Sequence, residues 1–551
     1  MQNSYNDAMR ATTLDYLASI DKDNPPKPSV IEAEILENME RVFQTYNNAN
    51  VGRKWKVPLT LEFQQIAQII ATLYPVCRVI TGGTNSDPEY DLLAIYQTTG
   101  PDEGIYVTSD DVFRNLARQY NYRITTHEYN EMITTLRDIV PRRPRCTQPH
   151  LIAVNNGIFN YETKQLQPFT QDLIFLTKSR IDYKDQVTNP IIHNDSDNTD
   201  WDVETWMSEL SDDPEITNVL WQVLGAIIRP NVPWGKSAWF YSESGNNGKG
   251  TLCELMRQLC GNNSYASIPL SDMGKDFMLE PLTRASAIIV DENDVGTYID
   301  KAANLKAIIT GDVIQINRKF KTPISYQFKG FMIQCLNEMP RIKDKSDSFY
   351  RRQLFIPFTK CFTGAERKYI KQDYLHRHDV LEYVLHRVLN MNYDSLDTPK
   401  ACQDALEEYK EFNDPIRQFI DEILPECVWD LLPFTFLYEL YKAWFQKNIP
   451  SGTPQARNTF IKDLVIQIQT NAIWDCPDKN AKVKTANRIQ DAEPLIEEYG
   501  LRNWMNPHFI SSNDVNKKCI PQKLSSSYRG LTRRPQPLYT TKSLQDTQDD
   551  T

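Results

Sequence analysis

One segment in the middle of the chain, residues 237–259, limits the fold more than any other feature of the sequence. A short apolar run, 237–241, leads into a loop rich in glycine, asparagine and serine that ends in Lys249. Apolar residues then recur at a helical spacing over 252–259. Glycine and asparagine tolerate positive φ, so successive N–H groups can point into one concavity, to which a helix N-terminus and a lysine add positive charge. The pattern predicts a phosphate-binding loop between a parallel strand and a helix.

The loop departs at two positions from the usual pattern G-x-x-x-x-G-K-[ST]. Glu243 stands where a glycine is usual, and Gly250 stands where a magnesium-binding hydroxyl is usual. The nearest hydroxyl belongs to Thr251, which is therefore the candidate metal ligand of the loop. Taken alone, the segment is also compatible with an ordinary helix start. The residues expected to bind the nucleotide are Gly245, Asn246, Asn247, Gly248, Lys249, Gly250, Thr251 and Leu252.

Two later strands are expected to end in polar side chains. The continuous apolar run 287–290 is typical of a buried parallel strand, and ligands bind at the carboxyl ends of such strands. We expect Asp291 to hold magnesium, directly or through water, and Glu292 to polarise an attacking water as general base. The apolar run 331–336 ends in Asn337, whose amide is expected to contact the γ-phosphate and the attacking water. The alternative is that these polar residues belong to ordinary solvated turns.

An arginine pair follows these strands. Arg351 and Arg352 precede another apolar run, 353–358. An arginine that faces the γ-phosphate of a neighbouring subunit neutralises charge in the transition state of phosphoryl transfer. We expect one of the two arginines to have this role, and the sequence does not distinguish between them. A surface pair that flanks a strand is the alternative.

Composition adds limits on the class of protein. A length of 551 residues corresponds to about two to four domains. The net charge of −11 gives no general attraction for nucleic acid, so DNA binding must depend on local basic clusters. The sequence has neither a long apolar run nor a basic, apolar leader, so we expect no membrane span, no secretory signal and a cytoplasmic location. The cysteines form no Cys-x-x-Cys pair, which argues against a zinc site or a disulfide framework.

These patterns predict a multidomain α/β protein with a central parallel sheet. Prolines and arginines at 141–145 mark one boundary, and the polar, acidic end marks another. The expected organisation is an α-rich N-terminal accessory or collar region (1–145), a segment before the ATPase (146–210), the ATPase (211–365), a helical linker or lid (366–425), a C-terminal domain (426–534) and a disordered tail (535–551).

In this order, the motifs resemble those of the superfamily 3 helicases, in the branch of the phage and plasmid primase-helicases and the poxvirus-type primase-helicases. The shared features are the Asn-Gly-Lys loop, the Asp-Glu strand, Leu305-Lys306 before Gly311-Asp312, Asn337-x-x-Pro340 and Phe349-Tyr350-Arg351-Arg352, together with the segment 156–166. The resemblance implies an AAA+ ATPase that uses ATP and Mg²⁺ and assembles as a ring, usually a hexamer, with active sites between subunits. It implies translocation on single-stranded DNA, typically 3′ to 5′, in a phage, plasmid or mobile element. It also leaves room for other replication proteins as partners, at a bacterial or viral replication site.

A basic hairpin is the first candidate for DNA contact. Residues 313–326 are predicted to form two strands around a tip that contains Arg318, Lys319, Phe320 and Lys321. Cations bind phosphates and an aromatic ring can stack on a base. The resemblance implies a hairpin that projects into the central pore of the ring. In this chain, Lys306 is a further DNA-binding candidate. The alternative is a solvated hairpin turn.

The C-terminal region is predicted to be a winged helix that recognises origin DNA. Apolar positions indicate helices over 434–445 and 458–469, separated by a turn at 451–454. The second helix is the expected recognition helix, with Arg457 and Lys462 as its exposed cations. The alternative is a small packing domain that does not contact DNA.

Two other functions stay open beside a replicative helicase and initiator. The first is a bifunctional primase-helicase, which would need paired carboxylates on a strand of an upstream sheet. The Asp-x-Asp pairs 21–23 and 195–197 lie next to prolines or in a polar linker, which argues against it. The second is a DNA-binding initiator whose nucleotide site controls assembly without catalysis, and Gly250 keeps this alternative open. Measuring ATP turnover with and without single-stranded DNA separates it from a helicase.

Overall fold

The computed structural model describes residues 4–535, except for residues 53, 84–85, 300, 320, 364–366 and 451. Phe320, one position in the predicted turn at 451–454, and all but the first residue of the predicted tail lie outside the described residues. The chain divides into two compact units, Met1–Leu406 and Glu407–Thr551. In the described ranges, no helix combines the length and the apolar character that crossing a membrane requires.

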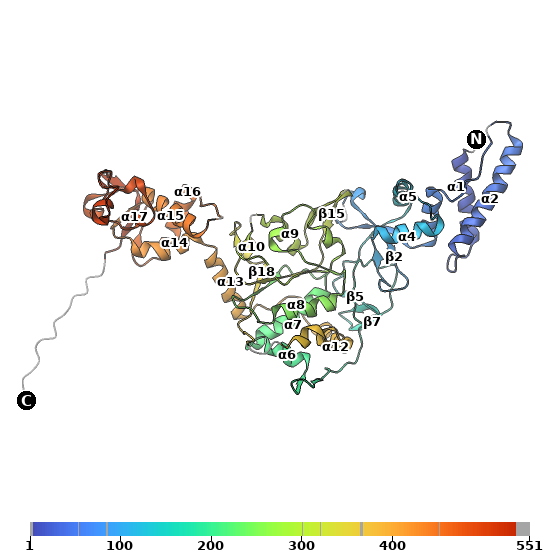
Figure 1. The fold of residues 1–551 in the computed structure, drawn as a ribbon, viewed down its shortest axis with the longest axis horizontal. Helices are drawn as coiled ribbons and strands as arrows, with labels where there is room; N and C mark the ends of the chain where they lie inside the picture. Colours follow the sequence, from blue (N-terminus) through green and yellow to red (C-terminus); the bar gives the residue numbers. More distant parts are fainter. Residues whose placement is uncertain are drawn as a thin grey trace, which may run out of the picture. The chain divides into compact units, whose positions relative to one another are not determined.

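The N-terminal part of the first unit packs five helices with a small sheet (Figure 1). The helices are α1 (Tyr5–Ser19), α2 (Pro28–Ala49), α3 (Phe63–Leu73), α4 (Asp110–Tyr120) and α5 (Thr126–Ile139). The sheet has the order β3-β2-β1-β4, formed by Tyr106–Val107, Leu92–Tyr96, Val76–Ile80 and Arg142–Pro144. The apolar runs 92–96 and 104–107 predict a strand pair from the sequence, and this is confirmed because β2 and β3 are antiparallel neighbours. The sequence spacing predicts Val42 on the buried face of α2, and this prediction is wrong by one residue, since Phe43 is buried and Val42 is exposed.

Short antiparallel strands follow before the main sheet. Two short apolar runs around Asn155-Asn156-Gly157 predict a hairpin from the sequence. It is confirmed in the three-stranded sheet of β5 (Leu151–Val154), β6 (Gly157–Asn160) and β7 (Gln165–Gln167). The aspartate-rich segment expected to be a solvated linker forms a hairpin, β8 (Ile192–Asn194) with β9 (Thr199–Trp201). Asp197 lies in its turn and accepts hydrogen bonds from Thr199. The Asp-x-Asp pair at 195–197 therefore lies outside the strands.

A five-stranded parallel sheet forms the centre of the first unit. Its order is β11-β12-β16-β10-β18, formed by Tyr265–Ala266, Ala287–Val290, Phe331–Leu336, Ser237–Tyr241 and Gln353–Pro357. These strands are almost fully buried, which explains why they are continuous apolar runs rather than alternating patterns. Figure 1 shows α7 (Pro214–Ile228) and α8 (Lys249–Cys260) beside this sheet, with α6 (Val203–Glu209) and α12 (His378–Asn390) next to them. The remaining helices of this region are α9 (Ala302–Thr310), α10 (Asp347–Tyr350) and α11 (Lys368–Gln372).

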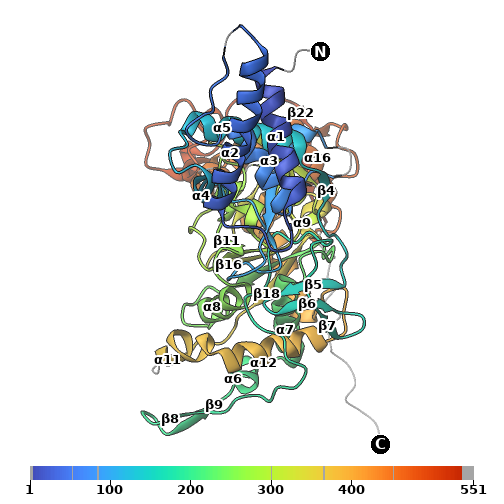
Figure 2. The same ribbon diagram turned by 90° about the vertical axis from the view of Figure 1, so that its right-hand side faces the viewer.

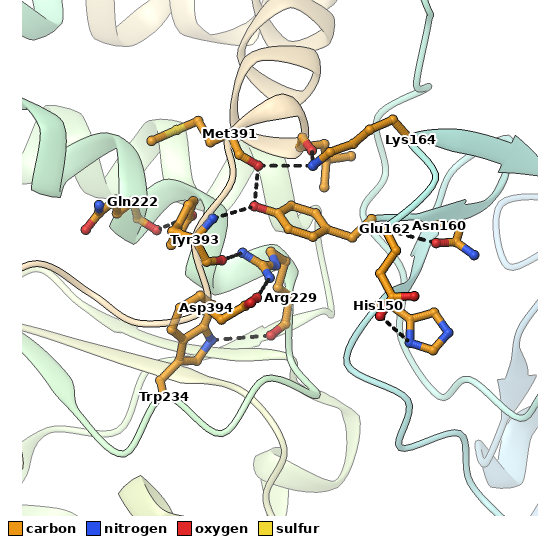
Figure 3. A network of polar contacts seen from close by, with 12 residues as sticks. His150, Asn160, Glu162, Lys164, Gln222, Arg229, Trp234, Met391, Tyr393 and Asp394 are labelled. Carbon is orange, nitrogen blue, oxygen red and sulfur yellow. Dashed lines mark hydrogen bonds and ion pairs between the residues drawn. The ribbon is translucent and has the colours of Figure 1, made fainter.

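The buried side chain of Arg229 connects Tyr161, which follows β6, with Tyr393 and Asp394, which follow α12 (Figure 3). The Arg229 side chain is 1% exposed and lies over the rings of Tyr161, Trp234 and Tyr393. Its guanidinium donates to the Tyr393 carbonyl at 2.7 Å and pairs with Asp394 at 3.1 Å. The aromatic faces replace part of the lost hydration of the guanidinium, which allows a charge to be buried here.

The predicted basic hairpin is present as β14 (Val313–Arg318) and β15 (Lys321–Gln327). Its base is bonded to the end of β1, because the Gln327 amide donates to the Thr81 carbonyl at 2.8 Å. The Thr81 hydroxyl also donates to the Ser325 carbonyl at 3.1 Å. A Cβ on Gly82 would lie 2.7 Å from Ser325 Cβ, so this close approach of the two backbones requires glycine.

The second unit has its own core and mixed secondary structure. Both predicted helices are confirmed, with slightly different ends, as α15 (Phe434–Asn448) and α16 (Arg457–Ile468). The predicted apolar faces are buried at Phe434, Leu437, Tyr441, Phe460 and Leu464. The other elements are α14 (Pro415–Ile423), α17 (Leu495–Glu498), α18 (Val515–Lys518), the sheet β19-β23-β20 (Leu431–Pro433, Gly530–Arg533, Trp474–Asp475) and the pair β21-β22 (Val483–Lys484, Ser527–Tyr528). The boundary between the two units falls within α13 (Lys400–Phe412).

Candidate nucleotide-binding site

The predicted phosphate loop joins the carboxyl end of β10 to the start of α8. Asn246 (φ 56°) and Gly248 (φ 87°) occupy the left-handed region, as the glycine and asparagine content of the loop indicated. A Cβ on Gly248 would also lie 2.6 Å from Leu210 Cδ2, so a side chain at this position would require Leu210 to move. The Asn247 side chain braces the loop by accepting from the Lys249 amide at 3.3 Å and donating to the Ser244 carbonyl.

The Lys249 side chain is buried and points across the sheet edge toward the end of β16. Its Nζ donates to Asn337 Oδ1 and to the Leu336 carbonyl, both at 2.9 Å, and to the Ser242 carbonyl at 3.2 Å. Burial lowers the pKa of Lys249. Within the described part of the chain no carboxylate pairs with this ammonium. Neutral oxygens therefore hold the lysine in place, and its charge is left to attract an anion.

The Asp-Glu pair follows β12 at the same edge of the sheet. Asp291 pairs with Arg257 of α8, with Oδ1 2.9 Å from Nη2. Burial raises the pKa of Asp291, but the hydrogen bond and charge of Arg257, together with nearby Lys371, hold it below its usual value. The Glu292 side chain is exposed at this edge. The strand order separates β12 from β10 by β16 alone, so Lys249, Asn337 and Asp291 emerge from three neighbouring parts of one edge.

Asn293 is a positioning residue that the sequence reasoning missed. It is buried, and its Nδ2 donates to Gln334 Oε1 and to the Cys335 carbonyl, both at 3.0 Å. Its Oδ1 accepts from the Leu270 amide at 2.9 Å. These bonds fix the turn that carries Asp291 and Glu292 against β16. The one indication in the sequence is that Asn293, an amide residue, directly follows Asp291 and Glu292.

The first turn of α8 places the other loop candidates differently. Leu252 is fully buried in the core, and its amide donates to the Gly248 carbonyl at 2.9 Å. Thr251 is half-buried and Gly250 is open, with a Cβ on Gly250 lying 3.8 Å from the ammonium nitrogen of Lys371. Neither Lys371 nor Arg257 was expected from the sequence, because both reach the site only through tertiary packing.

The structure does not bring the arginine pair to the loop of its own chain. Arg352 immediately precedes β18, and its carbonyl accepts from Ser237, the first residue of β10, at 2.8 Å. Because β18 and β10 are parallel, Arg351 and Arg352 lie at the amino edge of the sheet, opposite the edge that carries Lys249. The Arg352 guanidinium donates to the Ser348 carbonyl, and Arg351 is exposed.

The DNA-binding candidates differ in their surroundings. At the hairpin, Lys321 pairs with Asp110 at 2.8 Å, Arg318 donates to the Thr322 carbonyl at 2.8 and 3.0 Å, and Lys319 is exposed. Lys306 pairs with Asp344 at 2.5 Å. In the second unit, Arg457 and Lys462 are exposed on α16.

Three regions of the chain match known protein families. Residues 96–217 match the family "D5 N terminal like", and residues 411–491 match "Poxvirus D5 protein-like". These matches place the chain in the D5-type primase-helicase branch. Between them, residues 240–352 match a "Family of unknown function (DUF5906)", a segment that contains the loop, the Asp-Glu pair, Asn337 and both arginines.

Individual relatives of this D5-type chain are distant. It is 23% identical over 348 residues to an Acanthamoeba polyphaga mimivirus protein named "Putative helicase L207/L206", an alignment that covers 56% of this chain and 34% of that protein. The chain thus spans about a third of the length of that curated relative. Among solved structures, two forms of the NrS-1 C terminal region are 13% and 15% identical, with TM-scores of 0.40 and 0.39. Each alignment covers 77% of this chain and 97% of the other.

Proposed function

We propose that this D5-type chain is an ATP-dependent DNA helicase that also acts as a replication initiator in a phage, plasmid or other mobile element. The observation that carries the proposal is the placement of Lys249. Its ammonium lies 2.9 Å from Asn337 Oδ1, at the sheet edge where Asp291 and Glu292 also emerge. A loop lysine, an acidic strand end and a polar strand end at one edge are the parts that ATP hydrolysis requires.

Each part has a separate role in the proposed reaction. The loop amides and Lys249 hold the β- and γ-phosphates, and Glu292 orients and deprotonates the attacking water. Asn337 holds Lys249 in place and lies where its amide can contact the γ-phosphate. Asp291 presents carboxylate oxygens of the kind that Mg²⁺ prefers, one of which lies 2.9 Å from Arg257. Asp291 and Thr251 would hold the metal ion, which supplies charge neutralisation at the phosphates.

The position of the arginine pair supports action between subunits. Arg351 and Arg352 lie at the sheet edge opposite Lys249, so they are placed to serve the loop of a neighbouring copy rather than their own. This arrangement fits a ring, with a hexamer as the expected size. The parallel sheet that carries the loop fits an AAA+ ATPase.

The proposed DNA contacts are the hairpin tip and α16. Arg318, Lys319, Phe320 and Lys321 would contact single-stranded DNA in the pore, together with Lys306, during 3′ to 5′ translocation. The second unit would act as a winged helix that binds origin DNA through the exposed cations of α16. Other replication proteins would join at a bacterial or viral replication site.

A specific observation also favours a second candidate function. Gly250 offers no hydroxyl, and Arg257 occupies one oxygen of Asp291. Both features weaken the expected metal site. A nucleotide-controlled origin-binding protein that does not hydrolyse ATP would have the same loop and the same hairpin.

Steady-state ATP hydrolysis by the wild type and Glu292→Gln, each with and without single-stranded DNA, tests the proposal. We expect DNA to stimulate the wild type and the variant to lose about a hundredfold or more, because it lacks the general base. Glu215→Gln, on an exposed position of α7, is the matched control and should retain the wild-type rate. A wild type that binds ATP without hydrolysing it under any DNA condition would instead support the second candidate.

A further inference from the structure

A lysine from outside the phosphate loop lies next to the one loop position that lacks its usual side chain. The residue after the loop lysine usually carries a hydroxyl that binds the metal ion, and here it is Gly250. A Cβ built on Gly250 would point to within 3.8 Å of Lys371 Nζ, with no other atom within 4 Å apart from its chain neighbours and the backbone of its own helix. The ammonium of Lys371 therefore lies beside the space that a hydroxyl and its metal ion occupy in a standard loop.

Three side-chain contacts hold α11, the helix that carries Lys371, in this position. Arg367 pairs with Glu209 of α6 at 2.6 Å, and the Tyr369 hydroxyl donates to Asp197 of the β8–β9 hairpin at 2.6 Å. Just after α11, His376 Nε2 lies 3.3 Å from Glu254 of α8. Figure 2 shows α11, α6 and the β8–β9 hairpin near one another in the lower part of the first unit. These contacts fix the position of α11, and therefore that of Lys371, relative to the start of α8.

The start of α8 carries an excess of positive charge, which favours binding of an anion. Arg257 pairs with Asp291 at 2.9 Å and with Glu254 at 3.7 Å, so its charge is balanced within the chain. Lys249 begins α8, and Lys371 lies beside Gly250 and near Asp291. Among the described residues, no carboxylate pairs with either Lys249 or Lys371. The partial positive charge of the α8 N-terminus adds to this excess. A bound polyphosphate would supply the missing negative charge.

We infer that Lys371 binds the terminal phosphates of the bound nucleoside triphosphate and supplies positive charge beside the loop position that lacks its usual hydroxyl. The inference rests on the proposed ATPase function and identifies which residue outside the loop completes its phosphate site. A lysine suits this position because its ammonium is a compact charge on a flexible stem that can follow the phosphates. Gly250 suits it as well, because a side chain there would take up the space between Lys371 and the loop.

Equilibrium binding of ATP, ADP and AMP to the full-length chain tests the inference. We expect Lys371→Met to weaken ATP binding about tenfold, the size of a lost charged hydrogen bond, and to leave AMP binding unchanged. Lys368→Met removes the same charge from the same helix and should match the wild type for all three nucleotides. Equal ATP affinity in Lys371→Met and wild type would overturn the inference, and so would equal losses for ATP and AMP.

A second variant exchanges the lysine for the usual hydroxyl. Gly250 has an ordinary φ and open space, so serine fits there without strain. We expect Gly250→Ser combined with Lys371→Met to recover ATP affinity in Mg²⁺ and not in EDTA, because a hydroxyl acts through the metal ion. If the double variant binds ATP in Mg²⁺ no better than Lys371→Met does, the inference that Lys371 compensates for the missing hydroxyl is wrong. If the wild type itself binds no ATP, the proposed function fails, whereas an unaffected Lys371→Met in an active wild type overturns this inference alone.

Discussion

At the scale of single residues, the contact between Lys249 and Asn337 links the proposed phosphate loop to the neighbouring strand. The lysine is held by two main-chain carbonyls and one amide side chain, so only Asn337 can be altered without changing the backbone. We expect Asn337→Ala to lower kcat about a hundredfold, the cost of losing one polar group at the reacting phosphate, with little change in KM. Steady-state kinetics over a range of ATP concentrations measures both constants.

The control for this change is Asn231→Ala, which removes an amide that donates to the Gln148 carbonyl at 3.4 Å. It should leave kcat and KM unchanged. A kcat of Asn337→Ala within twofold of the wild type would show that Asn337 has no part in hydrolysis.

The sequence pattern predicts the candidate residues that follow strand ends, but it does not indicate Arg257 and Lys371, which reach the same edge through tertiary packing. Lys249, Asp291 and Asn337 lie at one sheet edge because the carboxyl ends of parallel strands meet there, and apolar runs mark those strands in the sequence. Arg257 and Lys371 lie on helices, and nothing in their local sequence indicates which neighbour they face. Their positions depend on how α8 and α11 pack, which periodicity does not define.

At the scale of elements, the base of the β14–β15 hairpin is tied to the sheet of the N-terminal part. The predicted hairpin is confirmed, but its docking on Thr81 and Gly82 was not foreseen, because contacts distant in sequence leave no local pattern. The β8–β9 hairpin was missed for a different reason. Its strands are short, and the segment 194–202 that contains its turn is rich in aspartate, a composition typical of a solvated linker.

The close approach at Gly82 gives a test of this junction. In Gly82→Val the new side chain would overlap Ser325, where even a Cβ lies 2.9 Å from the Ser325 carbonyl oxygen. We expect the variant to lower the free energy of unfolding of the first unit by about 1–3 kcal/mol, the usual cost of overpacking. Urea denaturation measures this change. Gly52→Val is the control, because a Cβ on Gly52 meets no atom within 4 Å, and equal stability of the two variants would contradict a packed junction.

At the scale of the whole molecule, the two compact units have separate cores. The core of the second unit draws, among the described residues, only on positions between 416 and 531. The first unit contains the buried Arg229, whereas the second contains the buried carboxyl group of Glu493. Burial raises the pKa of Glu493, although amide donors including Val428 act in the opposite direction. We therefore expect two unfolding transitions that respond to different substitutions.

The sign of the pH effect follows from the raised pKa of Glu493. The folded unit binds the proton more tightly than the unfolded chain, so this stabilisation is complete below the ordinary glutamate pKa and is lost as pH rises through the folded value. Glu493→Gln should remove this dependence from one calorimetric transition only. Arg229→Ala should lower the other transition by about 5 °C, since deleting a large side chain packed against three buried aromatic rings costs about 3–5 kcal/mol. Scanning calorimetry from acid to neutral pH checks both variants. If each variant shows one transition whose midpoint temperature differs from that of the wild type, the two units unfold together.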